Sequence, residues 1–285
     1  MERIFILIQY YSPHHLLSRC TAWLADLKSP KWLISKVIKL FVRVFDVNME
    51  EAAEPDCGRY DSFNAFFTRA LREDARPLAD ADLVCPADGV ISQVGDIRAN
   101  LLLQAKGRLY TTTELLGGDG ERAAAFYGGL FATIYLSPRD YHRVHMPLDG
   151  RLTATTYIPG RLFSVNGVTA RHVDRLFARN ERLVCYFDTQ AGPMAMVLVG
   201  AMIVAGIDTV WGGRSVPPPR RPVTLDFTEP PDAVALERGQ EMGRFRLGST
   251  VILLFPENAV SWSERYVAGT PTRLGEELGD LLGGD

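Results

Sequence analysis

From about Leu83 onward the chain consists of short apolar segments separated by glycines and prolines. The segments are rich in Val, Ile, Tyr and Phe, and they include GVISQVG, FATIYL, RLTATTYI, RLVCYFD, MAMVLVGAMIVAGI and STVILLF. Runs of this length and composition, bounded by turn residues, are typical of β-strands. The sequence therefore predicts a β-rich core over residues 81–285.

Residues 1–80 have the pattern of amphipathic helices. In KWLISKVIKLFVRVF, the polar residues Lys31, Ser35, Lys39 and Arg43 recur every four positions, with Lys36 beside them. This spacing places them on one helical face and leaves apolar side chains on the rest of the surface. Together with the β-rich core, this region predicts an α+β protein whose sheet is largely antiparallel.

A second helix is expected in DSFNAFFTRALREDARPL. Asp61 or Ser62 can cap its first turn, and the Arg76-Pro77 step would end it.

Positive charge is concentrated at the N-terminus. The whole chain carries −3, whereas residues 1–45 hold seven Lys/Arg and two Asp/Glu, which gives +5 and leaves −8 on the remaining 240 residues. A chain without an overall basic field is not expected to bind nucleic acid. The cationic helix is either a core helix with one wet edge or an interfacial helix. Trp23, Trp32 and the paired Tyr10-Tyr11 of the N-terminal segment favour a lipid headgroup zone.

Further patterns restrict the class of protein. No stretch reaches the apolar length needed to cross a bilayer, and the N-terminus lacks the pattern of a secretory signal. The four cysteines are scattered without a C-x-x-C pair. We therefore expect a protein that is soluble or lies on a membrane.

Three residues supply the parts of a catalytic triad. Asp88 lies in CPADGVIS, His145 in YHRVHMP, and Ser249 in RLGST directly before the apolar run Val251–Phe255. Each alone is typical of a turn or a charged loop, but together they offer an acid, a base and a nucleophile. The H-x-x-H spacing of His142 and His145 does not match paired metal ligands on a helix, so no metal is expected.

One short pattern occurs twice. PADGVIS (86–92) and PLDGRLT (147–153) share P-x-D-G-x-[I/L]-[S/T]. The repeat indicates either two similar turns that lead into strands or a duplicated β unit.

Several long motifs follow one another in a fixed order: CPADGVISQVG, LLLQAKG, YLSPRDYHRVHMP, PGRLFSVN, LFARNERLVCYFDT and GQEMGRFRLGSTVILLF. In these motifs, from near the N-terminus to about Pro256, the chain resembles the bacterial phosphatidylserine decarboxylase proenzyme. The resemblance implies a lyase of phospholipid biosynthesis that converts phosphatidylserine to phosphatidylethanolamine and CO2. It also implies a core akin to a duplicated hybrid β motif.

The resemblance further implies that the chain cuts itself between Gly248 and Ser249. The products would be a large chain, 1–248, and a small chain, 249–285, held together as a heterodimer. Ser249 would become a covalent pyruvoyl group, which would form a Schiff base with the substrate and serve as the electron sink that pyridoxal phosphate provides elsewhere. No metal and no pyridoxal phosphate are implied.

The same resemblance assigns roles to further residues. His145 would be the base of self-cleavage, and Asp88 would orient its ring and stabilise the imidazolium. His142 would act in the decarboxylation step. Ser164 and Asn166 in LFSVN are candidate contacts of the substrate headgroup, and the alternative is a polar turn.

The expected location is peripheral, on the cytoplasmic face of a bacterial cell membrane of anionic phospholipid, and self-association stays open. Two alternatives use the same residues differently. A serine hydrolase would keep Ser249 intact and act on external esters or peptides, whereas a non-catalytic lipid-binding relative would never be cut.

Overall fold

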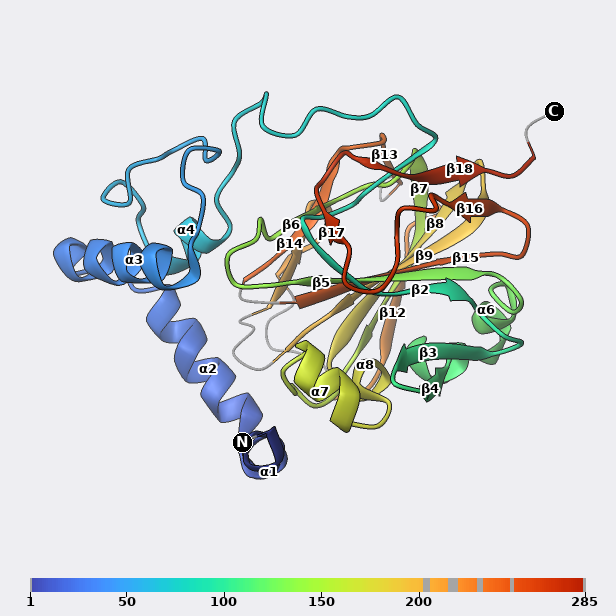
Figure 1. Cartoon of the computed structure of the whole chain (residues 1–285), viewed down its shortest axis with the longest axis horizontal. Helices are drawn as coiled ribbons and strands as arrows, with labels where there is room; N and C mark the ends of the chain where they lie inside the picture. The colour runs from blue at the N-terminus through green and yellow to red at the C-terminus, as the bar shows by residue number, and fades with distance from the viewer. Residues whose placement is uncertain (1, 202–205, 215–219, 230–232, 247–248, 284–285) are drawn as a thin grey trace.

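The structure of the 285-residue chain is a computed structural model that describes residues 2–201, 206–214, 220–229, 233–246 and 249–283. Figure 1 shows helices at the N-terminal end beside a body of strands, with short helices on the edge of that body. In the described residues the helices are α1 (Glu2–Tyr11), α2 (His14–Ala25), α3 (Lys31–Phe45), α4 (Phe63–Phe67), α5 (Thr112–Leu115), α6 (Gly120–Ala124), α7 (Gly167–His172) and α8 (Leu176–Arg179).

The largest sheet has the strand order β12-β7-β8-β9-β15-β5-β2-β17, with β13 also paired to β7. Each of its strand pairs in the described part of the chain is antiparallel. The helical start and the antiparallel sheet confirm the predicted α+β class. The strands of this sheet are β2 (Gly89–Asp96), β5 (Leu130–Leu136), β7 (Gly150–Ile158), β8 (Arg182–Thr189), β9 (Gly192–Val199), β12 (Val223–Asp226), β13 (Val234–Leu236), β15 (Ser249–Phe255) and β17 (Pro271–Thr272).

Three smaller sheets surround the large one, with the orders β11-β10-β14-β6, β1-β18-β16 and β3-β4 among the described residues. Their strands are β1 (Leu83–Val84), β3 (Leu101–Ala105), β4 (Arg108–Thr111), β6 (Arg143–His145), β10 (Ile207–Thr209), β11 (Gly213–Arg214), β14 (Glu241–Phe245), β16 (Val260–Trp262) and β18 (Glu277–Leu281).

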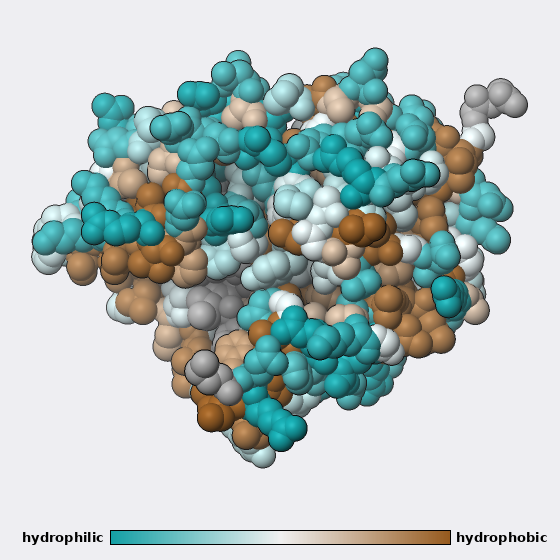
Figure 2. Space-filling view, in the orientation of Figure 1, coloured by the Kyte–Doolittle hydropathy of each residue, from teal (hydrophilic) through white to brown (hydrophobic). Residues whose placement is uncertain are grey.

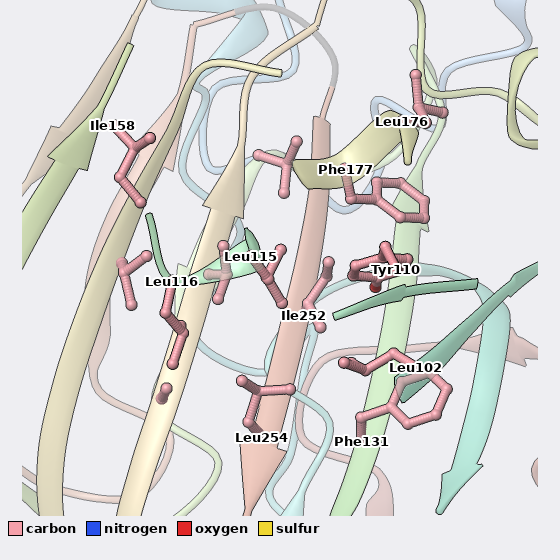
Figure 3. Packing of buried hydrophobic residues seen from close by; sticks show 14 of the residues in the cluster. Leu102, Tyr110, Leu115, Leu116, Phe131, Ile158, Leu176, Phe177, Ile252 and Leu254 are labelled. Carbon is pink, nitrogen blue, oxygen red and sulfur yellow. The ribbon is translucent and has the colours of Figure 1, made fainter. Parts of the chain in front are cut away.

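Strand β15 lies at the centre of the large sheet, between β5 and β9. Its side chains alternate between two hydrophobic clusters, as the pleat of a strand requires. Val251, Leu253 and Phe255 join one cluster, and Ile252 and Leu254 join the other. Figure 3 shows Ile252 and Leu254 among side chains from the neighbouring strands and short helices. The prediction that Val251–Phe255 forms a buried strand is therefore confirmed.

The predicted second helix is much shorter than expected. Ser62 does cap it, because its hydroxyl accepts a hydrogen bond from the Ala65 N–H at 3.1 Å. The helix α4 then ends at Phe67. Beyond it the backbone turns to hydrogen-bond the preceding loop, where the Ala53 N–H donates to Ala70 and the Arg72 N–H donates to Glu51. These tertiary bonds override the local helical pattern.

Helix α3 buries one narrow edge and exposes most of its other residues. Ile34 and Ile38 are its buried residues, and they pack in a third hydrophobic cluster with residues of α2 and α4. Of the 25 large hydrophobic residues that are exposed in the described chain, 15 lie in residues 1–45, so this apolar surface is concentrated on the first three helices. Figure 2 shows it as brown side chains beneath a teal upper edge of α3.

No helix in the described ranges is both long and apolar enough to cross a membrane.

Both copies of the P-x-D-G pattern lead into strands of the large sheet, β2 at Gly89 and β7 at Gly150. At Gly89 a glycine is required by close approach, because an added Cβ would lie 2.3 Å from the Tyr135 carbonyl oxygen. The turn-then-strand interpretation is confirmed at both positions. Duplication of a β unit stays a prediction, as does the division into domains at residues 80 and 81.

Candidate active site

Three neighbouring strands of the large sheet, β15, β5 and β2, place Ser249 and Asp88 at the same end of their strands (Figure 1). Ser249 begins β15 and pairs with Leu136, the last residue of β5. On the other side of β5, Val90 pairs with Tyr135, and Asp88 lies two residues before it. Since neighbouring strands are about 4.8 Å apart, the backbones of Asp88 and Ser249 are separated by roughly 10 Å. Gly248 lies outside the described residues.

Both histidines come after the end of β5: His142 directly precedes strand β6, and His145 is its last residue. This strand pairs with β14, which precedes Ser249 in the chain, and Glu241 of β14 lies opposite His145. At the other end of the pair, the Phe245 N–H donates to the His142 carbonyl oxygen at 2.9 Å. The two histidines therefore lie alongside β14, and the backbone of His142 is opposite Phe245, the last residue of that strand.

The ring of His145 is fixed by two hydrogen bonds. Its Nδ1 lies 2.7 Å from the Gly239 carbonyl oxygen, which can only accept, so Nδ1 carries the proton. Its Nε2 lies 3.1 Å from the Tyr141 hydroxyl, which then donates to it. Burial lowers the pKa of His145 below its ordinary value of 6.5. At neutral pH the ring is therefore an uncharged imidazole with a basic Nε2, as a general base requires.

His142 is fully buried and uncharged. Its ring stacks on Phe67 with the centroids 4.1 Å apart, and Nε2 donates to the Ser137 carbonyl oxygen at 3.0 Å. Burial, and next the charge of Arg69, lower the pKa of His142 to about 3. Its Nδ1 has no hydrogen-bond partner in the described part of the chain. The ring thus holds a free lone pair at Nδ1, while Nε2 is hydrogen-bonded to Ser137, the residue that follows β5.

The carboxylate of Asp88 is bound by an arginine instead of by His145. Arg76 donates to both of its oxygens, from Nε at 2.9 Å and from Nη2 at 2.5 Å, and the Leu274 N–H donates at 2.8 Å. A guanidinium fork makes two charge-assisted bonds, which a neutral imidazole cannot match. Among the described hydrogen bonds none joins Asp88 to His145, so the expected orienting bond is replaced by the Gly239 carbonyl. The charge of Asp88 still favours protonation of His145 at longer range.

Three contributors to this site were missed from the sequence. Tyr141 lies within the YLSPRDYHRVHMP motif, where its position next to the histidines was the available signal. Arg76 was interpreted as the end of a helix. Gly239 acts through its backbone carbonyl, which leaves no side-chain signal in a sequence.

The two candidate headgroup residues have structural contacts. The Asn166 side chain caps α7, because Oδ1 accepts from the N–H groups of Val168 at 3.0 Å and Thr169 at 3.1 Å. The backbone N–H of Ser164 donates to the Gln9 side chain at 2.8 Å. A role of Ser164 and Asn166 in substrate binding stays a prediction.

Across the described ranges, no group of three or more His, Cys, Asp or Glu side chains is arranged to hold a metal ion.

Known proteins match the chain over nearly its whole length. The family model described as phosphatidylserine decarboxylase matches residues 63–280, and a second, described as PSD, matches residues 4–46. The phosphatidylserine decarboxylase proenzyme of Stutzerimonas stutzeri is 55% identical, over 98% of this chain and 94% of its own length. The proenzymes of that name from Pseudomonas aeruginosa (strain LESB58) and Marinobacter nauticus are 55% and 54% identical, over 97% and 99% of this chain and 96% and 99% of their own lengths. With this identity over the full chain, the protein belongs to the phosphatidylserine decarboxylase family.

Proposed function

We propose that this protein decarboxylates phosphatidylserine to phosphatidylethanolamine and CO2, after cutting itself between Gly248 and Ser249. Family membership supports the reaction. The observation that carries the self-cleavage is the position of Ser249, which begins a central strand of the large sheet two strands away from the segment that holds Asp88. His145 lies on β6 and His142 directly before it, and β6 pairs with β14, the strand that precedes Ser249 in the chain. From Thr250 to Leu254, β15 is paired with a neighbour on both sides.

Self-cleavage uses Ser249 as an internal nucleophile. Its Oγ attacks the Gly248 carbonyl carbon while Nε2 of His145 takes the hydroxyl proton, and the peptide C–N bond breaks to leave an ester and a free amine. Removal of the Ser249 Cα proton then expels the Gly248 carboxylate and leaves dehydroalanine at position 249. Water converts this residue to pyruvoyl and releases ammonia, so all atoms are accounted for.

The residues around Ser249 fit a cofactor made in place from the chain. Thr250 to Leu254 pair with both β5 and β9, so a cut before Ser249 leaves the small chain anchored in the sheet. The buried apolar side chains of this strand each contribute about 1.5–3 kcal/mol to that anchoring. When present, a pyruvoyl group supplies a carbonyl that draws electrons from the bond to the departing CO2. His142, which is uncharged and rigidly stacked, would exchange a proton at Nδ1 during this reaction.

The pH dependence of self-cleavage reports on the base. Since burial lowers the pKa of His145 below 6.5, more than half of the rings remain neutral at pH 6.5. We expect newly translated precursor to cleave at pH 6.5 with more than half of its rate at pH 8, and to slow only at lower pH. Circular dichroism over the same range controls for unfolding. A rate already below half at pH 6.5 would contradict the assignment of His145.

The first three helices are proposed to hold the protein on an anionic membrane. On α3, Trp32, Leu40 and Val44 are each more than 60% exposed. The Nζ atom of Lys36 lies 5.1 Å from the ring centroid of Trp32. Apolar and cationic side chains on one exposed helix suit the boundary between lipid headgroups and acyl chains. The protein would then reach its lipid substrate from the membrane surface.

Removing the cationic stripe should weaken membrane binding and leave self-cleavage intact. We expect the variant with Lys31, Lys36, Lys39 and Arg43 all changed to Gln to bind anionic vesicles more weakly. Each lysine or arginine near such a surface contributes about 1 kcal/mol, which salt screens. Co-sedimentation with vesicles across a salt series measures the loss, and the apolar face should keep part of the binding at high salt.

A matched control changes four exposed cations on the β-rich body to Gln, and it should bind vesicles like the parent. Equal binding by the stripe variant and the parent at low salt would show that the stripe does not face the membrane. The residues of the control are Arg98, Lys106, Arg151 and Arg220.

A further inference from the structure

A polar cavity of about 260 Å³ adjoins the candidate active site. Asp88, Asp140 and Tyr141 line it on the side of the site, and four arginines contribute to its walls. One of them, Arg69, lies two residues after Phe67, the ring on which His142 stacks. The cavity therefore opens beside the residues that the proposed reaction uses.

Three of these four arginines have carboxylate partners. Arg76 pairs with Asp88 at 2.5 Å and with Glu51 at 2.8 Å. Arg273 also pairs with Glu51, at 2.5 Å. Arg139 lies 3.9 Å from Asp140.

Arg69 differs from the other three. It is only 4% exposed, and no carboxylate of the described chain lies within 4.0 Å of its guanidinium. Its Nη2 donates to the Arg139 carbonyl oxygen at 3.2 Å, and the group lies 5.4 Å from the ring centroid of Phe66. Its Nε has no hydrogen-bond partner among the described residues. The lining also holds four carboxylates, Asp46, Glu51, Asp88 and Asp140, so the cavity as a whole is not cationic. Burying a charge without a direct counter-ion is costly, so an anion bound to the Arg69 guanidinium itself would be stabilised.

The geometry of a guanidinium suits two kinds of anion, carboxylate and phosphate. Under the proposed function the substrate carries both. An arginine bound to its carboxylate would stabilise the charged ground state that must be lost as CO2 departs, and would therefore slow the reaction. A phosphodiester keeps its negative charge throughout the reaction. An arginine bound to that group holds the substrate without opposing the chemistry.

We propose that this cavity is a subsite for the phosphodiester of the lipid headgroup and that Arg69 is the side chain that binds it. The inference rests on the proposed function for the identity of the lipid. The shared chemistry is a phosphate-type anion, which either a lipid diester or free inorganic phosphate could provide.

Kinetics of the cleaved enzyme in detergent micelles test the subsite. Because the contact is the same in ground and transition states, Arg69→Met should raise KM for phosphatidylserine about tenfold or more and leave kcat within about twofold. Arg69→Lys keeps the charge but loses the two-pronged hydrogen bonding of the guanidinium, so its KM should lie between those of the parent and Arg69→Met. Arg59→Met removes an exposed arginine elsewhere and should match the parent. A KM of Arg69→Met within twofold of the parent would overturn the proposal.

Thermal unfolding gives a second measurement that does not depend on turnover. Dimethyl phosphate should raise the Tm of the parent and of Arg59→Met, and not that of Arg69→Met, relative to chloride at equal ionic strength. Stabilisation by inorganic phosphate alone would overturn the assignment to a lipid diester. If Arg69→Met fails to fold, the same comparison is made between Arg69→Lys and the parent: dimethyl phosphate should raise the Tm of Arg69→Lys less than that of the parent. A parent that shows these shifts without turning over phosphatidylserine would instead refute the proposed function.

Discussion

Ser249→Ala is expected to accumulate as one uncut chain of 285 residues without decarboxylase activity. The substitution removes the hydroxyl that would attack the Gly248 carbonyl, and no other atom of the side chain can form the ester. The backbone pairing of position 249 with Leu136 does not depend on the side chain, so the fold should be kept. Denaturing electrophoresis separates the uncut chain from the 1–248 and 249–285 products of the parent.

The neighbouring residue provides a matched control. Thr250 is fully buried on the same strand, and its hydroxyl has no hydrogen-bond partner in the described part of the chain. Thr250→Val has nearly the same shape and should cleave to the same extent as the parent. A Ser249→Ala chain that is still cut at this position would refute the internal nucleophile.

Substituting each histidine in turn should affect self-cleavage and decarboxylation separately. His145→Ala removes the general base, so self-cleavage should slow by about 10²–10⁴-fold, the usual contribution of such a base. His142→Ala should still cleave and should lose decarboxylase activity on a similar scale. Time courses of newly translated precursor measure cleavage, and CO2 release from the cleaved protein measures decarboxylation.

The stacked ring of His142 calls for a second variant. His142→Gln can still donate to the Ser137 carbonyl and fills more of the buried space than alanine does. It should therefore retain the stability that His142→Ala loses and still lack decarboxylase activity. Normal cleavage by both the His142 and the His145 variants would show that neither ring is the base.

Local patterns predicted the parts of the fold that depend on local chemistry. The apolar run Val251–Phe255 became a buried central strand, and Ser62 became a helix cap. The helix expected after Ser62 ended at Phe67, since hydrogen bonds to residues 51–53 compete with its helical bonds. The order of strands in the large sheet depends on which chain segments meet, and no single segment encodes that order.

The candidate site was predictable in its residue types but not in all its contacts. The ordered motifs identified Asp88, His142, His145 and Ser249. In the structure Asp88 and Ser249 lie at the same end of neighbouring strands of the large sheet, and the two histidines lie along β14, which precedes Ser249. The partner of Asp88 was missed because its pairing with Arg76 depends on tertiary folding. Likewise, a lone arginine in a sequence has the same appearance whether it is paired or buried without a counter-ion, so burial had to be known before Arg69 could be interpreted.

Intact-mass analysis of the purified parent protein tests the central proposal most directly. We expect two chains, 1–248 and 249–285, which separate under denaturing conditions and stay together in native buffer. The mass of the small chain should be lower, by the mass of one ammonia molecule, than that of the same peptide beginning with serine, because a pyruvoyl group stands in place of Ser249. Active preparations that contain the intact 285-residue chain alone, with Ser249 unmodified, would contradict the proposed mechanism.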